Sequence, residues 1–178
     1  MARGNSLVGS TKTLADYLGH DDPLAVLLWP DLVQTVFHEG PRPRTAHPEQ
    51  LSAAARVIYY VGCFDGELVN GGMSQFFSNS SGNHAHETLQ ALRAIGAALS
   101  SSLLEKALTI FPNAIAPIDR QLRCDLLFAF EKRNPKFLED LTDEYYNRVV
   151  PFRPKTDEDL MALELAFMQQ HQAERVAG

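Results

Sequence analysis

The sequence predicts an all-α fold: a single globular multi-helix domain of about seven or eight helices with a small N-terminal helical extension. Three observations lead to this prediction. Apolar residues recur at steps of three and four, the spacing of amphipathic helices, along most of the chain. Alternating strand patterns are nearly absent. With 178 residues, 45% of them hydrophobic, the chain can bury a core without disulfides or metal ions.

The chain divides at a proline-rich stretch. Residues 1–40 are expected to form the N-terminal helical extension, in which Asp22 caps a helix that begins at Pro23. Residues 41–48 contain three prolines and are predicted to be a linker. Residues 49–178 then form the main helical domain.

Six apolar stripes at helical spacing define most helices of this domain. The stripes are Leu51, Ala54, Ala55 and Ile58; Leu89, Leu92 and Ile95; Leu103, Leu104, Ala107, Leu108 and Phe111; Leu122, Leu126, Leu127 and Phe130; Leu138, Leu141 and Tyr145; and Leu160, Leu163, Ala166 and Phe167. The first helix should begin at Pro48. The last should have Thr156 as its N-cap and Asp157, Glu158 and Asp159 in its first turn, where acids suit the helix dipole.

Composition narrows the function. Lys and Arg number 16 against 22 Asp and Glu, so the formal net charge is −6, and no basic cluster is present. Direct binding of nucleic acid is therefore disfavoured, because phosphate contacts need such a cluster. No apolar run is long enough for a signal peptide or a membrane span. We expect a soluble cytoplasmic protein, in which Cys63 and Cys124 are small buried hydrophobes.

No catalytic, metal-binding or cofactor-binding residues are predicted. His84, His86 and Glu87 have no further ligands at a recognised spacing, so they are read as a solvated loop and helix start. The serines at 78, 80 and 81 lack the context of a nucleophile, and no phosphate-binding glycine loop is present.

One segment resists the helical interpretation. Residues 64–77 contain three glycines and an Asn-Gly pair between apolar residues. Local rules favour a β-hairpin there about as much as two helices joined by a left-handed glycine.

This segment carries a motif of fixed spacing. Its members are Glu67, Asn70, Gly71, Gly72, Gln75, Phe76, Phe77, Asn79, Ser80 and Gly82. The motif resembles the signature of a bacterial family of helical domains that includes a DNA-mimic protein. The resemblance is strong over about residues 56–112 and weaker to about 150. It departs at Val69, where relatives often have Asn, and at Met73, where an aromatic residue is usual.

The resemblance implies an all-α domain, often a homodimer, with no known catalytic activity. It also favours helix, glycine joint and helix over residues 64–82, with Phe76 and Phe77 buried. The DNA-mimic relative uses surface carboxylates to occupy a DNA-binding protein. The implied function is a non-catalytic protein-interaction module whose partner is a basic DNA-binding regulator.

The signature has two interpretations. In the structural one, the two phenylalanines anchor the core, the glycines allow close backbone approach, and Asn70 and Asn79 satisfy helix ends. In the functional one, Glu67, Asn70, Gln75 and Asn79 form a polar pocket for a small ligand or peptide, or the site of an uncharacterised enzyme.

Acidic residues supply the candidate partner-binding surface. Glu139, Asp140, Asp143 and Glu144 share one side of a helix, opposite its apolar stripe. Asp65 and Glu67, from a stretch without bases, form a second group. Lys136 and Arg148 flank the first group and would weaken its field.

Overall fold

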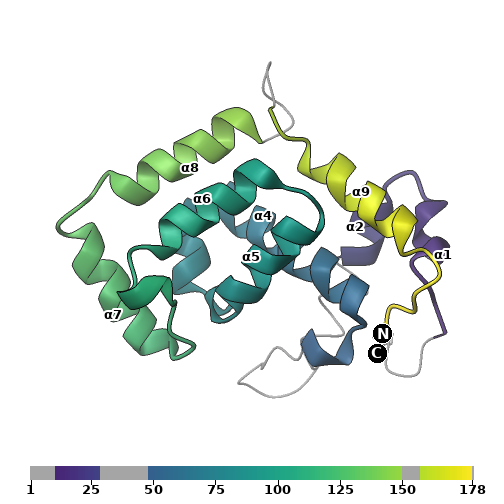
Figure 1. The fold of residues 1–178 in the computed structure, drawn as a ribbon, viewed down its shortest axis with the longest axis horizontal. Helices are drawn as coiled ribbons and strands as arrows, with labels where there is room; N and C mark the ends of the chain where they lie inside the picture. The colour runs from purple at the N-terminus through teal and green to yellow at the C-terminus, as the bar shows by residue number, and fades with distance from the viewer. Residues whose placement is uncertain (1–10, 29–47, 150–156, 178) are drawn as a thin grey trace, which may run out of the picture. The chain divides into compact units, whose positions relative to one another are not determined.

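A computed structural model describes residues 11–28, 48–149 and 157–177, and these residues are all-α, which confirms the predicted fold class (Figure 1). They contain eight α-helices, within the predicted number. Their only strand-like pairings are two isolated bridges, which join residues 13 and 175 and residues 51 and 177. The predicted linker lies outside the described residues except for its last residue, and Thr156 lies outside them entirely.

The chain forms two compact units. The first unit comprises Met1–Tyr59 and Met161–Gly178, and the second comprises Tyr60–Leu160. Two helices cross the boundaries: α4 (Ala53–Ser78) and α9 (Leu160–Gln170).

The first unit contains two short helices, α1 (Ala15–Leu18) and α2 (Pro23–Leu27). The predicted cap of α2 is confirmed, since Asp22 Oδ1 accepts a 3.0 Å hydrogen bond from the Ala25 amide. The two ends of the described chain are joined by backbone hydrogen bonds, such as that from the Val176 amide to the Lys12 carbonyl at 2.9 Å.

Two helix starts differ from the prediction. Pro48–Gln50 form a single 3-10 turn, and α4 begins at Ala53, where the Ser52 hydroxyl accepts a 3.2 Å hydrogen bond from the Ala55 amide. The serine provides the cap that the proline cannot, so the helix begins after it. Likewise, α9 begins only at Leu160, so the acids at 157–159 precede it instead of occupying its first turn.

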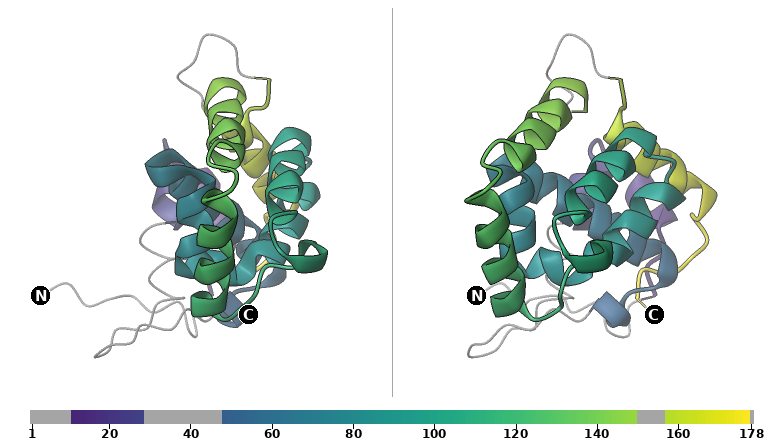
Figure 2. Two further views of the ribbon diagram at one scale, coloured as in Figure 1. Left: turned by 90° about the vertical axis from the view of Figure 1, so that its left-hand side faces the viewer. Right: turned by 60° about the vertical axis from the view of Figure 1, so that its left-hand side comes forward.

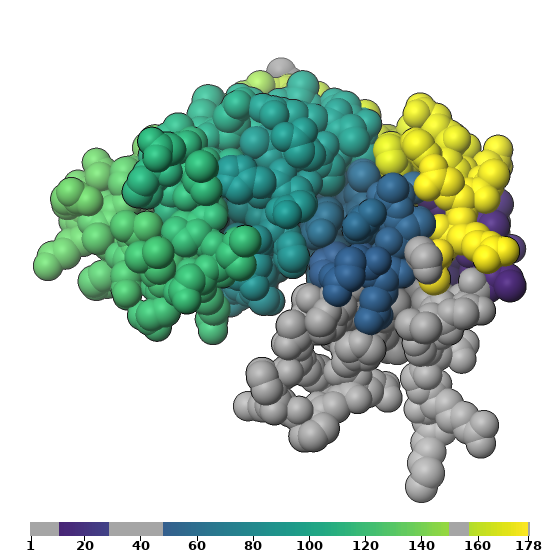
Figure 3. Space-filling model, turned by 60° about the horizontal axis from the view of Figure 1, so that its bottom comes forward, coloured from purple at the N-terminus to yellow at the C-terminus, as the bar shows by residue number. Residues whose placement is uncertain are grey.

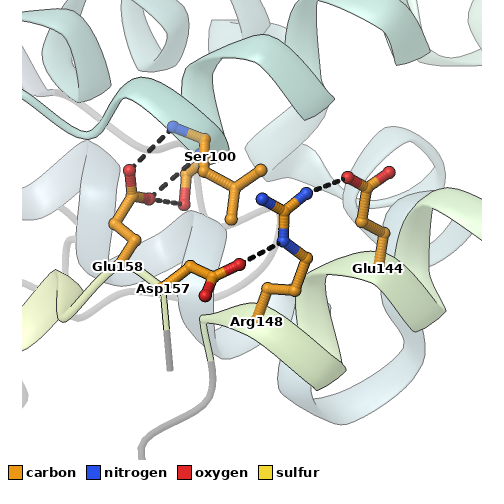
Figure 4. Close-up of polar contacts among 6 residues, drawn as sticks. Ser100, Glu144, Arg148, Asp157 and Glu158 are labelled. Atoms are coloured by element: carbon orange, nitrogen blue, oxygen red, sulfur yellow. Dashed lines mark hydrogen bonds and ion pairs between the residues drawn. The ribbon is translucent and has the colours of Figure 1, made fainter. Parts of the chain in front are cut away.

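Glu158 has a different role from the one predicted. Its carboxylate accepts hydrogen bonds from the amides of Leu99 at 2.7 Å and Ser100 at 3.0 Å, and from the Ser100 hydroxyl at 2.5 Å (Figure 4). These amides belong to the first turn of α6, whose own N-cap, Ala97, has no capping side chain. A buried carboxylate nearly 60 residues away therefore caps this helix.

The second unit is built on the C-terminal part of α4. The elements that follow are η3 (Ser80–His84), α5 (Ala85–Ala94), α6 (Ala98–Leu108), η4 (Pro112–Ala114), α7 (Arg120–Glu131) and α8 (Phe137–Arg148). A chain of edge-to-face aromatic contacts runs through its core. Phe64 contacts Phe76 and Tyr145 at ring-centroid distances of 5.2 and 5.8 Å, and Phe77 contacts Phe111 at 5.1 Å.

The glycine segment is a helix, a joint and a helix, as the family resemblance implied, and not a hairpin. Within α4 the backbone leaves helical geometry at Gly71 (φ −162°, ψ 15°) and at Gly72 (φ 74°, ψ −169°). Only glycine adopts the second conformation without strain. Phe76 and Phe77 are completely buried, as predicted. The Met73 amide, freed by the joint, donates a 3.1 Å hydrogen bond to Thr142 Oγ1 of α8.

The predicted apolar stripe of α7 is wrong in part. Leu127 is buried and Leu126 and Phe130 are half-buried, but Leu122 is 52% exposed. The next residue, Arg123, is completely buried instead. The first turn of the helix thus directs Arg123, and not Leu122, into the second unit.

Candidate functional site

Two polar side chains of the signature and one serine beside it converge on the carboxylate of Glu67. Glu67 Oε2 accepts hydrogen bonds from Gln75 Nε2 at 2.8 Å and Asn79 Nδ2 at 2.9 Å, and Oε1 accepts one from Ser81 Oγ at 2.9 Å. In a straight helix, residues 67 and 75 would lie ~12 Å apart along the axis. The joint lies between them, so the change of direction in α4 allows these two side chains to meet.

The structure brings together three of the four residues of the predicted pocket. Asn70 is exposed and is not among the groups that bond to Glu67. Ser81, a residue outside the predicted pocket, takes its place. Because the donors are turned toward Glu67, the cluster links the two parts of α4 across the joint. The donors are already used within the protein, so the cluster gives no support to the small-ligand interpretation.

Arg123 is a residue of this region that no sequence pattern predicted. Its guanidinium donates to four carbonyl oxygens and one amide oxygen, which uses all five of its N–H groups. The acceptors are the carbonyls of Phe77 (2.6 Å), Asn79 (2.9 Å), Pro117 (2.6 Å) and Ile118 (3.2 Å) and Asn83 Oδ1 (2.8 Å). Burial lowers the pKa of this guanidinium from its usual value. The signature glycine Gly82 makes room for it, since a Cβ there would lie 2.7 Å from Arg123 Nε.

Two of the four acids of α8 form ion pairs and two do not. Lys136 forms an ion pair with Glu139 at 2.8 Å, and Arg148 forms ion pairs with Glu144 at 2.5 Å and Asp157 at 2.6 Å (Figure 4). Asp140 and Asp143 are exposed and form no ion pair with any residue that the structure describes.

Hydrogen bonds to α4 fix which side of α8 faces outward. Thr142 bonds to the joint, the Tyr145 hydroxyl donates to Asp65 Oδ1 at 2.5 Å, and the Tyr146 hydroxyl donates to the Val69 carbonyl. These contacts turn the opposite side of the helix, with Asp140 and Asp143, to solvent.

Asp65, the other predicted partner-binding acid, lies apart from this surface. It is partly buried beneath Tyr145, and this burial raises the pKa of the carboxyl, while the hydrogen bond from the tyrosine partly opposes the rise. Among the predicted partner-binding acids, the exposed ones are therefore all on α8: Glu139, Asp140 and Asp143.

The side chains in the described part of the chain include no group of three or more His, Cys, Asp or Glu placed to hold a metal ion. None of its helices is long and apolar enough to cross a membrane.

The fold and this surface together define an all-α protein whose glycine-jointed helix orients a helix rich in acids. The family model for the DMP19-like protein matches residues 49–171. The chain therefore belongs to the DMP19-like protein family, which confirms the resemblance to a family that includes a DNA-mimic protein. No curated protein and no solved structure matches the chain.

Proposed function

We propose that the protein is a non-catalytic protein-interaction module that binds a DNA-binding regulatory protein through carboxylates placed where DNA would offer phosphates. Membership of the DMP19-like family supports this proposal. The observation that carries it is the exposed pair Asp140 and Asp143 on a helix whose orientation is fixed by Thr142, Tyr145 and Tyr146.

The spacing of the acids suits a partner that grips phosphates. Asp140 and Asp143 are ~4.5 Å apart along the helix axis, and acids four residues apart are separated by ~6 Å. These separations are of the same order as the ~3.4 Å axial spacing of charges on one DNA strand. Glu139 and Glu144 add two carboxylates. The ion pair of Glu139 with Lys136 is exposed, and that of Glu144 with Arg148 is half-exposed. Ion pairs open to solvent contribute little energy, so a cationic partner can replace Lys136 more readily than Arg148.

The test is affinity capture of DNA-binding proteins from the source cell on the full chain. We expect a basic partner that is retained in about 50 mM salt and released in about 500 mM salt, because contacts that replace phosphates are steeply salt-dependent. The variant Asp140→Asn/Asp143→Asn should lose most of this retention. A matched control, Glu87→Gln/Asp125→Asn, removes two exposed acids elsewhere and should retain the partner. Equal loss in both variants, or retention that salt does not change, would contradict the proposal.

The proposal includes a homodimer that acts in the cytoplasm, where it would meet a DNA-binding regulator. Support for the dimer comes from the family resemblance. Sedimentation velocity of the purified chain tests it, and a single species of about 20 kDa, the mass of one chain, would contradict it.

A further inference from the structure

Lys136 lies at the start of the acidic helix, on the same side as the acids. It is the N-cap of α8, and its backbone angles are already helical (φ −92°, ψ −18°). With about 100° of rotation per residue, Asp140 and Asp143 lie about 40° and 20° to either side of the direction of Lys136, and Glu139 lies about 60° away. All four residues are exposed, whereas the buried residues of α8 lie on the far side of the helix.

The ammonium of Lys136 interacts with all three of these acids. Its Nζ lies 2.8 Å from Glu139 Oε1. The hydrogen bond and the charge of Glu139 raise the pKa of Lys136 above its usual value, and the charges of Asp140 and Asp143 add to the rise. A cation of the chain itself therefore lies in the field of carboxylates that are proposed to bind the partner.

The side chain of Lys136 contributes little to the stability of the fold. It is 71% exposed, and it does not cap the first turn of α8. A cation at the start of a helix is unfavourable, because the positive end of the helix dipole lies there. The pair with Glu139 is open to solvent, and such pairs add little stability. Replacement of this lysine should therefore leave the fold and its Tm almost unchanged.

Arg148, at the other end of α8, differs in each of these respects. Its guanidinium bridges Glu144 and Asp157 (Figure 4). Its carbonyl accepts hydrogen bonds from the amides of Asp157 at 2.7 Å and Glu158 at 3.2 Å. A cation at the end of a helix also suits the helix dipole. Arg148 thus joins α8 to residues 157 and 158, whereas the side chain of Lys136 connects α8 to no other element by a hydrogen bond or ion pair that the structure describes.

The start of α8 is accessible to a partner. In Figure 2 (left), α7 and α8 are the elements of the second unit nearest the viewer, and no other helix of this unit lies in front of α8. In Figure 3, the green surface at the left edge, where α7 ends and α8 begins, is not covered by another described element. A macromolecule can therefore reach the acids and the lysine together.

We propose that Lys136 occupies the place of a partner's cation on the acidic side of α8, and that a basic partner displaces it on binding. This inference rests on the proposed function and names the group that competes with the partner. The competing group of the partner is a lysine or arginine side chain, which would pair with Glu139 and Asp140. Because the chain holds Lys136 beside these acids, its effective concentration there is high. Lys136 thereby weakens the binding of any single cation and favours partners that bring several cations at once.

Titration of a fluorescent oligo-arginine peptide of about eight residues into the full chain, in about 50 mM salt, tests this inference by fluorescence anisotropy. The variant Lys136→Gln removes the competing cation, and Lys136→Arg keeps it. The matched control is Lys132→Gln, at the end of α7, because Lys132 is exposed and forms no ion pair with any described residue. Both glutamine variants change the net charge equally, so their comparison separates the position of the lysine from the charge of the protein.

We expect Lys136→Gln to bind the peptide about two- to fivefold more tightly than the wild type, the range that one exposed ion pair accounts for. Lys136→Arg should bind like the wild type, and Lys132→Gln should gain less than about 1.5-fold. The gain of Lys136→Gln should be lost in about 500 mM salt, and also when it is combined with Glu139→Gln/Asp140→Asn/Asp143→Asn. Circular dichroism and Tm should show that each variant retains the fold.

Other outcomes would overturn the inference and the proposed function separately. Equal effects of Lys136→Gln and Lys132→Gln, or weaker binding by Lys136→Gln, would overturn the inference. The proposed function would stand in that case if Asp140→Asn/Asp143→Asn still weakened binding of the peptide. Peptide binding that is unchanged in Asp140→Asn/Asp143→Asn would contradict the proposed function, and the inference with it.

Discussion

Substitution of Arg123 tests how the second unit is held together. The variant Arg123→Met keeps an apolar chain in place of the aliphatic part of the arginine and removes the guanidinium with its five hydrogen bonds. The Phe77 carbonyl, in the buried part of the site, would be left without this donor at a cost of about 1–3 kcal/mol. The other four acceptors are nearer the surface and can turn to water, so each loses only ~0.5–1.5 kcal/mol. Removing a buried charge that has no carboxylate partner offsets several kcal/mol of this loss.

The net expectation for Arg123→Met is a loss of about 2–4 kcal/mol of unfolding free energy, or a fall in Tm of about 5–15 °C. Urea unfolding followed by circular dichroism measures it. Arg123→Lys should lose a similar amount, because lysine keeps the charge but cannot supply five donors in a planar arrangement. The control is Arg120→Met, which removes from the same helix an exposed arginine with a single hydrogen bond, to the Ser78 carbonyl at 2.7 Å. A loss below about 1 kcal/mol in Arg123→Met, or full rescue by lysine, would refute the account of Arg123 as a hydrogen-bonding anchor.

Two further predictions concern α4. Gly72→Val should destabilise the protein by several kcal/mol, because φ is 74° and a Cβ would lie 2.7 Å from Thr142 Cγ2. The control Gly66→Ala should not destabilise it, because a Cβ there meets nothing within 4 Å. A Tm within about two degrees of wild type for Gly72→Val would contradict this prediction. Asp65→Asn should stabilise the protein at pH 7 but not near pH 3. Because burial raises the folded-state pKa of Asp65 above its usual value of 3.8, its ionisation destabilises the fold as pH rises through that pKa; a stabilisation confined to acidic pH in urea unfolding would show the opposite sign.

Local rules predicted the helices but not the conformation of the glycine segment. Asp22 and the stripe at Leu103 and Leu108 involve neighbours in sequence, so spacing and capping identify their helices. The joint at Gly72 depends on Thr142, 69 residues beyond Met73, whose hydroxyl satisfies the freed amide. No window of local sequence contains that contact. Local sequence therefore did not distinguish a β-hairpin from two joined helices, and only the family resemblance favoured the helices.

The candidate surface was predictable only where it depends on residues close together in the sequence. The outward position of Asp140 and Asp143 follows from helical periodicity in α8. The burial of Asp65 does not, because its partner Tyr145 is 80 residues away. Arginine ordinarily lies on the surface, so its burial at position 123 could not be expected from the sequence. The apolar pattern predicted a buried Leu122 instead.

The signature residues act on the proposed interaction surface from a distance. The hydrogen bond between Gln75 and Glu67 links the two parts of α4 across the joint, and Gly72 gives the joint its conformation. The joint in turn presents the Met73 amide to Thr142, and α8 is thereby rotated so that its acids face solvent. Under the proposed function, the motif would contribute to binding without touching the partner, because it sets the orientation of the helix whose carboxylates would do so. The choice of partner would then depend on residues outside the motif, namely the exposed acids of α8.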